Sequence, residues 1–286
     1  MSGTVPSLSI VFMIISCVIG FAIPVVLLLY FRLRKKADYL PFFIGCAVMI
    51  LFAFVLESLV HRMVLSSSAG ATIRENIWTY ALYGGAMAGL FEETGRFLAC
   101  KTILRKYRNR DINALMYGAG HGGIEAAVLL GITMINNLIY SFLINADKLY
   151  LLTEPLPEEY KAQFAEVIEA LITTPSYQFL LGGVERVFAV IVQISFSVLV
   201  WFAAKNKEKF LYYPLAILLH LLVDGSLVIA MDHGMGEGVN TIFLEGMVGV
   251  LALLCALLAR SVWKRNAGRK KISKLNGVWE HVGTLF

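Results

Sequence analysis

Long runs of apolar residues, separated by short polar segments, dominate the chain. An α-helix of about 20 apolar residues is long enough to cross the hydrocarbon core of a bilayer. Seven runs reach this length, at residues 8–31, 39–60, 77–99, 112–145, 177–204, 210–230 and 241–259. None shows the period-two alternation that the strands of a membrane β-barrel require. The pattern predicts an all-α, polytopic membrane protein built as a seven-transmembrane-helix bundle.

The composition agrees with this prediction. Of 286 residues, 58% are hydrophobic and only 16% are charged, with a mean hydropathy of +0.72, whereas a soluble domain is about 25% charged. The apolar runs are evenly spread, so we interpret residues 1–286 as a single integral membrane domain. The one long connection, an outer loop at 147–176, is predicted to contain an amphipathic helix at 158–171. Four apolar residues recur there at helical spacing, namely Phe164, Val167, Ile168 and Leu171.

The Lys and Arg residues are unevenly divided between the two ends of the predicted helices. Nineteen of the 25 fall on one side, including a basic tail at 260–286, and four fall on the other. Because cytoplasmic loops carry the excess of Lys and Arg, the division predicts an external N-terminus and a cytoplasmic C-terminus. It also explains the net charge of +5 by topology and by contact with anionic lipids, so no nucleic acid is needed as a partner.

Ionisable residues interrupt the apolar runs, although each charge near the bilayer centre costs about 2.5–3.5 kcal/mol on insertion scales. They are Glu57, Glu92, Glu93, Arg96, His121, Glu125, Glu185, Arg186, His220, Asp224 and Glu245. Glu57 and Glu245 are predicted near outer helix ends, where a carboxylate can reach water, and we interpret them as structural. Glu185 and Arg186 are interpreted as a structural ion pair in the outer half of the fifth helix.

Polar residues on three of the predicted helices lie at a similar depth in the membrane. At about 1.5 Å rise per residue, Glu92 and Glu93 lie roughly 12 Å from the inner end of their helix, and His121 and His220 roughly 15 Å from theirs. Arg96, one turn after Glu92, is expected to form an ion pair with it. We expect a carboxylate of Glu92 or Glu93 within about 4–6 Å of both imidazoles, where charges interact strongly. The shared cavity is expected to open toward the inner leaflet.

Spacing along the helices adds a second constraint. His121 and Glu125 are four residues apart, as are His220 and Asp224, so each pair shares one helix face. Pairs of this kind place an acid beside each imidazole.

Small residues are predicted to let the third and fourth helices approach closely. Gly85 and Gly89 form a stripe on the third helix, and Gly118 and Gly122 form a similar stripe on the fourth.

These residue types suit two kinds of chemistry. A carboxylate beside an imidazole can activate water for hydrolysis, with a donor for the developing oxyanion. Two His and a carboxylate are also ligand types that zinc takes, with one position left for water. A proton- or cation-coupled transporter using the same groups is the alternative. The odd helix number and the lack of an internal repeat favour the enzyme.

Three motifs occur in order along the chain: Glu92-Glu93-x-x-Arg96, Tyr117-x-x-x-His121 and His220-x-x-x-Asp224. Together they resemble the signature EExxxR, FxxxH and Hxxx(N/D) of the CAAX-protease and bacteriocin-processing superfamily of intramembrane proteases. The segments EETGR and GHGGIEA are similar to those of its YhfC branch, which is related to PrsW. The likeness covers residues 77–230, which it makes the catalytic core. It implies an endopeptidase that hydrolyses a peptide bond in or next to the membrane.

The resemblance implies seven candidate catalytic residues, namely Glu92, Glu93, Arg96, His121, Glu125, His220 and Asp224. Glu92 would be the general base with His121 as its partner, and His220 and Asp224 would polarise the scissile carbonyl. Glu93 and the arginine would orient the site. The arginine comes one residue earlier than in the superfamily signature, so the motif leaves open which of the two glutamates is the base.

The resemblance also implies a cofactor, a substrate class and a location. The YhfC branch is labelled a metalloprotease, which makes Zn²⁺ a candidate cofactor and His121, His220 and Glu93 candidate ligands. A metal-free glutamic mechanism is the alternative. The substrate would be a membrane protein or a lipidated or peptide substrate, and the location the bacterial cytoplasmic membrane.

Overall fold

The computed structural model describes residues 3–232 and 239–267. Within these residues every regular element is helical and none is a strand, which confirms the all-α class. The longer helices are α1 (Ser7–Leu29), α2 (Leu40–Val48), α3 (Ser58–Leu65), α4 (Ser68–Glu75), α5 (Ile77–Lys101), α6 (Ile112–Ala126), α7 (Thr133–Asn145), α9 (Glu158–Thr173), α10 (Ser176–Lys205), α11 (Tyr212–Asp232) and α12 (Val239–Asn266). The shorter elements are η1 (Tyr30–Arg34), η2 (Met49–Glu57), η3 (Ile103–Asn109), η4 (Ala127–Ile132), α8 (Tyr150–Thr153) and η5 (Lys207–Lys209).

Six continuous helical segments of the described chain are long and apolar enough to cross a membrane. They are Ser7–Arg34, Leu40–Leu65, Ile112–Asn145, Ser176–Lys205, Lys207–Met231 and Thr241–Asn266. The one predicted run outside this set, residues 77–99, forms α5, a helix of 25 residues. At about 1.5 Å per residue α5 is long enough to span the hydrocarbon core. Because α5 contains several polar and charged residues, it is less apolar than the other six segments. Judged by length and composition, the described chain therefore has six membrane-spanning candidates.

Two of these segments pass through a π-helical stretch without breaking. η2 joins α2 to α3, and η4 joins α6 to α7. π-helical turns inside α-helices are frequently found at functional sites. η2 ends at Glu57, and η4 begins two residues after Glu125. Both stretches therefore border the polar interior of the molecule.

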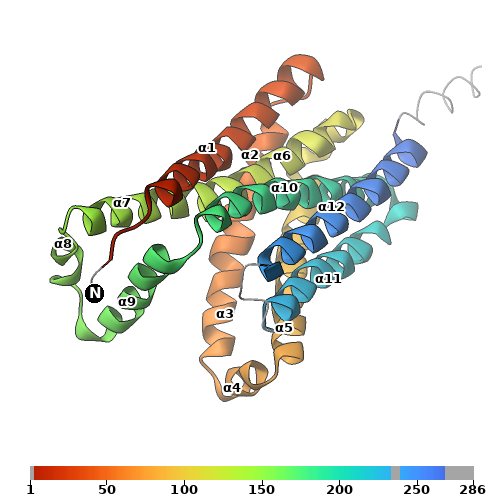
Figure 1. Cartoon of the computed structure of the whole chain (residues 1–286). Helices are drawn as coiled ribbons and strands as arrows, with labels where there is room; N and C mark the ends of the chain where they lie inside the picture. Colours follow the sequence, from red (N-terminus) through yellow and green to blue (C-terminus); the bar gives the residue numbers. More distant parts are fainter. Residues whose placement is uncertain (1–2, 233–238, 268–286) are drawn as a thin grey trace, which may run out of the picture.

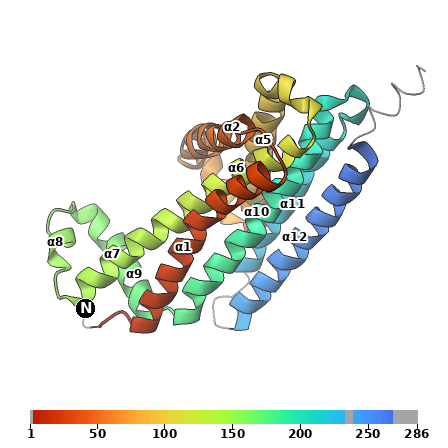
Figure 2. The same ribbon diagram turned by 90° about the horizontal axis from the view of Figure 1, so that it is seen from above.

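α10 is the central helix. It packs against α1, α5, α6, α11 and α12, and its residues 195–204 are all buried. Figures 1 and 2 show α1, α6, α10 and α12 running side by side, whereas α3 and the start of α5 project to one side, where α4 joins them. α5 lies against α11 along much of its length. This arrangement places the middle of α5 beside α10 and α11.

The glycine stripes allow close helix contacts, but not between the predicted partners. A Cβ on Gly85 or Gly89 would lie 2.6 Å or 2.7 Å from backbone oxygens of α11. A Cβ on Gly118 or Gly122 would lie 2.7 Å or 2.8 Å from atoms of α10. The expectation that the stripes join the third and fourth apolar helices was therefore wrong. Each helix uses its stripe against a different, later helix.

The long connection folds as predicted. α9 covers the expected helix, with Ile168 and Leu171 buried and Phe164 packed edge-on against Tyr140. Val167 is exposed, contrary to the expected apolar face.

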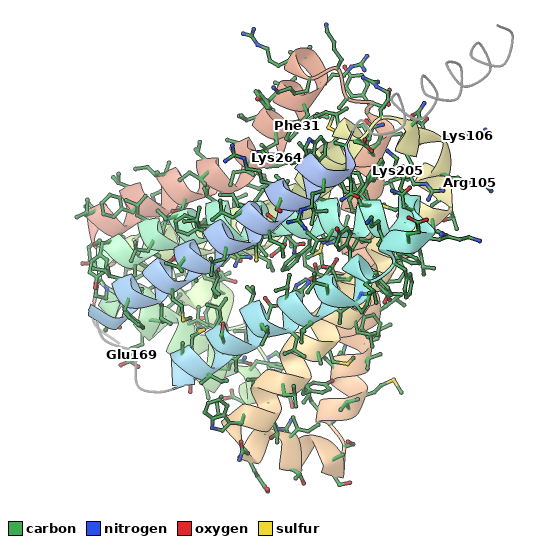
Figure 3. The ribbon with its side chains drawn as sticks, turned by 90° about the vertical axis from the view of Figure 1, so that its right-hand side faces the viewer. Phe31, Arg105, Lys106, Glu169, Lys205 and Lys264 are labelled. Atoms are coloured by element: carbon green, nitrogen blue, oxygen red, sulfur yellow. The ribbon has the colours of Figure 1, made fainter. Side chains whose placement is uncertain are left out.

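Basic residues gather at one end of the molecule. Figure 3 shows Arg105, Lys106, Lys205 and Lys264 there, and Glu169 of α9 at the other end. This segregation follows the charge pattern of the sequence. The predicted basic tail lies outside the described residues from position 268 onward.

Candidate active site

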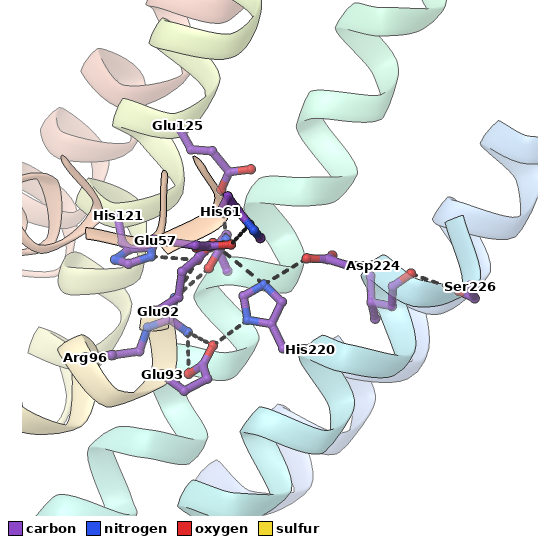
Figure 4. Close-up of polar contacts among 12 residues, drawn as sticks. Glu57, His61, Glu92, Glu93, Arg96, His121, Glu125, His220, Asp224 and Ser226 are labelled. Atoms are coloured by element: carbon purple, nitrogen blue, oxygen red, sulfur yellow. Dashed lines mark hydrogen bonds and ion pairs between the residues drawn. The ribbon is translucent and has the colours of Figure 1, made fainter. Parts of the chain in front are cut away.

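Five ionisable side chains meet in the interior where α5, α6 and α11 adjoin α10 (Figure 4). Glu92, Glu93 and Arg96 come from α5, His121 from α6 and His220 from α11. None is more than 6% exposed. The predicted convergence of three helices at one level is therefore confirmed.

Glu92 contacts both imidazoles. Its Oε2 is hydrogen-bonded to His121 Nε2 at 3.0 Å, and its Oε1 lies 3.8 Å from His220 Nε2. The expected approach of one carboxylate to both histidines is thus confirmed. With Glu92 ionised, His121 donates through Nε2, and its Nδ1 has no hydrogen-bond partner among the described residues.

Glu93 has a different environment, with both of its oxygens engaged. Arg96 donates from one nitrogen to Glu93 Oε1 at 3.0 Å and to Oε2 at 2.9 Å. His220 Nδ1 is hydrogen-bonded to Glu93 Oε1 at 2.8 Å. The expected ion pair of Arg96 with Glu92 is present at 3.9 Å, but Glu93 is the closer partner of the guanidinium, at 2.9 Å. Both Glu93 and Arg96 are fully buried, so each charge is compensated by the other.

Gln193 of α10 links the cluster, and the sequence analysis missed it. Its Oε1 accepts a hydrogen bond from Arg96 at 2.5 Å, and its Nε2 donates to Glu92 at 2.9 Å and to Glu125 at 2.8 Å. Every hydrogen-bonding group of this amide therefore faces a charged side chain. An amide in the middle of an apolar run was the signal that could have identified it, since burial of such a group requires partners.

Glu125 belongs to an outer part of the same network. It accepts from Gln193 and, at 3.0 Å, from Arg186, which also pairs with Glu185. The sharing of a helix face by His121 and Glu125 does not lead to a contact between them. The interpretation of Glu185 and Arg186 as an ion pair is confirmed, but Arg186 also joins Glu125 to it.

Asp224 borders the cluster on α11. Its Oδ2 lies 3.4 Å from His220 Nε2, and its side chain is 39% exposed. The pair predicted from the spacing of four residues therefore forms, with the aspartate at the edge of the buried cluster.

Glu57 also lies in this cluster rather than at a hydrated helix end. It is only 8% exposed and faces the charges of Glu92, His220 and Asp224. Its Oε1 is 3.0 Å from His61 Nε2. The position expected from the sequence was wrong because η2 and α3 continue beside α5 without turning away.

His61 was missed as well, although Glu57 and His61 repeat the spacing of four residues seen in the other acid–histidine pairs. Its Nδ1 is 3.0 Å from the hydroxyl of Tyr83. His61 therefore links Glu57, at the end of η2, to Tyr83 of α5.

The accessible side of the cluster faces away from the basic end. The side chains of Asp224, Glu185 and His61 are 39%, 31% and 29% exposed. α11 starts at the basic end, so Asp224 lies farther from that end than His220 does. The expectation of an opening toward the basic, inner side is therefore not supported. On α11, the buried His220 lies nearer to the basic end than the partly exposed Asp224 does.

No group of three or more His, Cys, Asp or Glu side chains within residues 3–232 and 239–267 has the geometry of a metal site. Glu93 has no oxygen free of a hydrogen bond, and His121 uses Nε2 for Glu92. The remaining face of the cluster consists of Glu92 Oε1, His220 Nε2 and Asp224 Oδ2. His220 Nε2 lies 3.8 Å from Glu92 Oε1 and 3.4 Å from Asp224 Oδ2.

Comparison with known proteins gives two matches. The model of the family described as "YhfC intramembrane metalloprotease" matches residues 19–248. An uncharacterized membrane protein YhfC of Bacillus subtilis (strain 168) is 32% identical over 259 residues, which is 90% of this chain and 98% of that protein. No solved structure matches. The matches do not favour the transporter alternative, and with the six apolar helices they indicate an integral membrane protein, consistent with the bacterial cytoplasmic membrane. The chain belongs to the YhfC intramembrane metalloprotease family.

Proposed function

We propose that this protein is an intramembrane endopeptidase that hydrolyses a peptide bond in or next to the membrane. The observation that carries the proposal is the contact of one buried carboxylate, Glu92, with the imidazoles of both His121 and His220. A buried acid–histidine set is the arrangement that water activation requires. Family membership adds independent support.

Glu92 is the proposed general base. Its Oε2 is occupied by His121 and Gln193, while its Oε1 has only the longer contact to His220. Oε1 is therefore the oxygen available to take a proton from water. The donors on Oε2 fix the carboxylate's orientation, which is the preorganisation that catalysis needs.

Glu93 is proposed as a positioning residue. Its two oxygens are held by Arg96 and His220, so it reaches a water only if those bonds break. Held in this way, Glu93 sets the ring orientation of His220 through Nδ1. These contacts support Glu92, in preference to Glu93, as the proposed base.

His220 is proposed to donate from Nε2 to the carbonyl oxygen of the scissile bond. An ionised Asp224 would repel a developing oxyanion, so its proposed role is to orient Nε2 until substrate takes its place. The 3.4 Å separation and the partly exposed side chain support this role, because Asp224 can move away without breaking a buried network.

The donor types fit a zinc ion. Tetrahedral zinc with nitrogen and oxygen ligands at about 2.0–2.2 Å has ligand atoms roughly 3.4 Å apart. The 3.4 Å between His220 Nε2 and Asp224 Oδ2 equals that value, so in the metal-assisted alternative we propose these two atoms as ligands, in place of Glu93 and His121. In that alternative Glu92 Oε1, 3.8 Å from His220 Nε2, stays the base, and His220 would hold the metal instead of donating to the carbonyl. A bound zinc would lower the pKa of its water and polarise the carbonyl. The metal-free glutamic mechanism remains the competing proposal.

The proposed topology has seven spans, with α5 as the seventh, an external N-terminus and a cytoplasmic C-terminus. In this proposal α5 crosses the membrane with its charged residues facing α6, α10 and α11 and not the lipid. Charged residues within membrane-spanning helices usually face the interior of the bundle in this way. Residues 1–286 form one membrane domain in this proposal, with a membrane protein or a lipidated or peptide substrate and with anionic lipids as partners.

The test compares new protein N-termini in membranes of cells that express wild type, Glu92→Gln or the control Glu169→Gln. Glu169 is an exposed carboxylate of α9, at the end of the molecule opposite the basic residues. We expect a set of cleavage products that disappears in Glu92→Gln and persists in Glu169→Gln. Products that persist in folded, membrane-inserted Glu92→Gln would refute the proposal. Repeating the reaction in purified proteoliposomes with a zinc chelator, followed by zinc repletion, separates the two mechanisms, since only the metal-assisted reaction is lost and restored.

A further inference from the structure

A groove follows one face of α10 between α1 and α12, which flank it in Figure 2. Two adjoining hollows of about 310 Å³ each form it, and Ile191 and Ile194 line both. Ile23 and Val26 belong to the α1 wall, and Ala256 belongs to the α12 wall. The groove therefore runs along helices that are apolar enough to span a membrane.

The lining is apolar except at one end. The hollow between α1 and α10 has only apolar residues in its wall. The hollow between α10 and α12 also includes Ser195 and Arg260. The Ser195 hydroxyl donates to the Ile191 carbonyl at 2.7 Å, so it offers no free donor to an occupant. Arg260 is therefore the one charged group in the described lining.

Arg260 stands near the basic end of the molecule. It is exposed, as is Lys264 one turn later on the same helix face, and neither forms an ion pair with a described residue. Trp263 lies between them in the chain and also lines the groove. Tryptophan and basic residues concentrate where a bilayer meets water. The apolar groove thus ends near two exposed cations, neither of which has an ion-pair partner among the described residues.

No residue of the polar cluster lines the groove. Ile191, which lines both hollows, is two residues from Gln193, and two residues correspond to about 200° around a helix, so Ile191 points away from the cluster. An occupant that lies along Ile191 is separated from Glu92 by α10. A peptide awaiting hydrolysis gains nothing from such a position, whereas a bound lipid does not need access to the cluster.

We propose that this groove is a binding site for one anionic phospholipid. One acyl chain occupies the groove along Ile191 and Ile194, and the phosphate lies against Arg260 and Lys264. The apolar wall and the terminal cations match the two halves of such a molecule. The site is independent of the proposed peptidase activity.

The test is native mass spectrometry of the delipidated, full-length protein titrated with phosphatidylglycerol or with phosphatidylcholine. We expect one phosphatidylglycerol to bind more tightly than phosphatidylcholine. Arg260→Gln should weaken its binding about fivefold, the equivalent of the roughly 1 kcal/mol that one basic residue contributes near anionic lipid. The matched control is Arg105→Gln, which removes an exposed cation of the same end outside the groove and should leave binding unchanged. Ala256→Phe, and the smaller change Ala256→Leu, should weaken binding by filling the groove.

Several results would overturn the proposal. Equal binding of the two lipids, or equal losses in Arg260→Gln and Arg105→Gln, would show only general attraction to charge. Unchanged binding in a folded Ala256 variant would place the acyl chain elsewhere. Competition by glycerol phosphate at the same concentration as the lipid would indicate a soluble phosphate ligand in place of a lipid.

Discussion

The buried ion pair of Glu93 and Arg96 allows the interior of the structure to be tested by measurement of stability. Both side chains are fully buried, and Arg96 also donates to Gln193. Removal of one partner from a buried pair usually costs about 3–5 kcal/mol, because the other charge stays without compensation. Arg96→Met should cost about 3 kcal/mol, the lower end of that range, since His220 still contacts Glu93.

The double variant carries the sharper prediction. Replacing both partners of a buried pair by apolar groups of similar size is often nearly neutral. Here the double variant Glu93→Leu with Arg96→Met also deprives Gln193 and His220 of partners, which costs about 1–3 kcal/mol for each unsatisfied group. We therefore expect it to be less stable than wild type, but more stable than the sum of the single variants predicts, by about 2–3 kcal/mol of coupling.

The assay is reversible unfolding in mixed detergent micelles, followed by circular dichroism, for wild type, both single variants and the double variant. Arg105→Met is the control, because Arg105 is an exposed cation, and it should change stability by less than about 0.5 kcal/mol. Additive effects of the two single changes, to within about 0.5 kcal/mol, would refute the pairing of Glu93 with Arg96.

Three further predictions concern packing, the site and topology. Gly120→Ala should lower the free energy of unfolding by about 1–3 kcal/mol in the same assay, because its Cβ would lie 2.0 Å from the Phe42 carbonyl oxygen. The control Gly84→Ala, whose Cβ meets no atom within 4 Å, should be neutral. Equal losses in the two variants would contradict the contact between α2 and α6. Gln193→Leu should lower kcat/KM for a cleavage site found in wild-type membranes about 10- to 150-fold, the value of one hydrogen bond to a charged group, whereas an unchanged kcat/KM would show that the amide does not position Glu92. A C-terminal reporter should be cytoplasmic and an N-terminal tag external; a cytoplasmic N-terminus would refute the seven-span topology.

The sequence by itself determined the class of the protein, the level at which its polar groups meet and the end at which its basic residues gather. The length of an apolar run sets whether a helix can span a bilayer, and the rise per residue sets how deep a side chain lies along it. Both quantities are properties of a single helix and do not depend on its neighbours. The meeting of Glu92 with His121 and His220 could therefore be predicted, and it is confirmed.

The tertiary structure decided which faces of the helices meet. Rotation about a helix axis and the choice of neighbour arise from packing between helices that are distant in the sequence. For this reason Arg96 pairs with Glu93 more closely than with Glu92, and the stripe containing Gly85 packs on α11 instead of α6. Gln193 joins the cluster because the buried face of α10 turns it there.

The exposure of each polar group was likewise a tertiary property. Glu57 was predicted from its place in the apolar run to reach water, but it is buried where η2 and α3 continue alongside α5. The partly exposed Asp224 follows the buried His220 by one turn along α11, which starts after the basic segment η5. Depth along one helix is fixed by the local chain, whereas access to water is fixed by which other helices cover that depth.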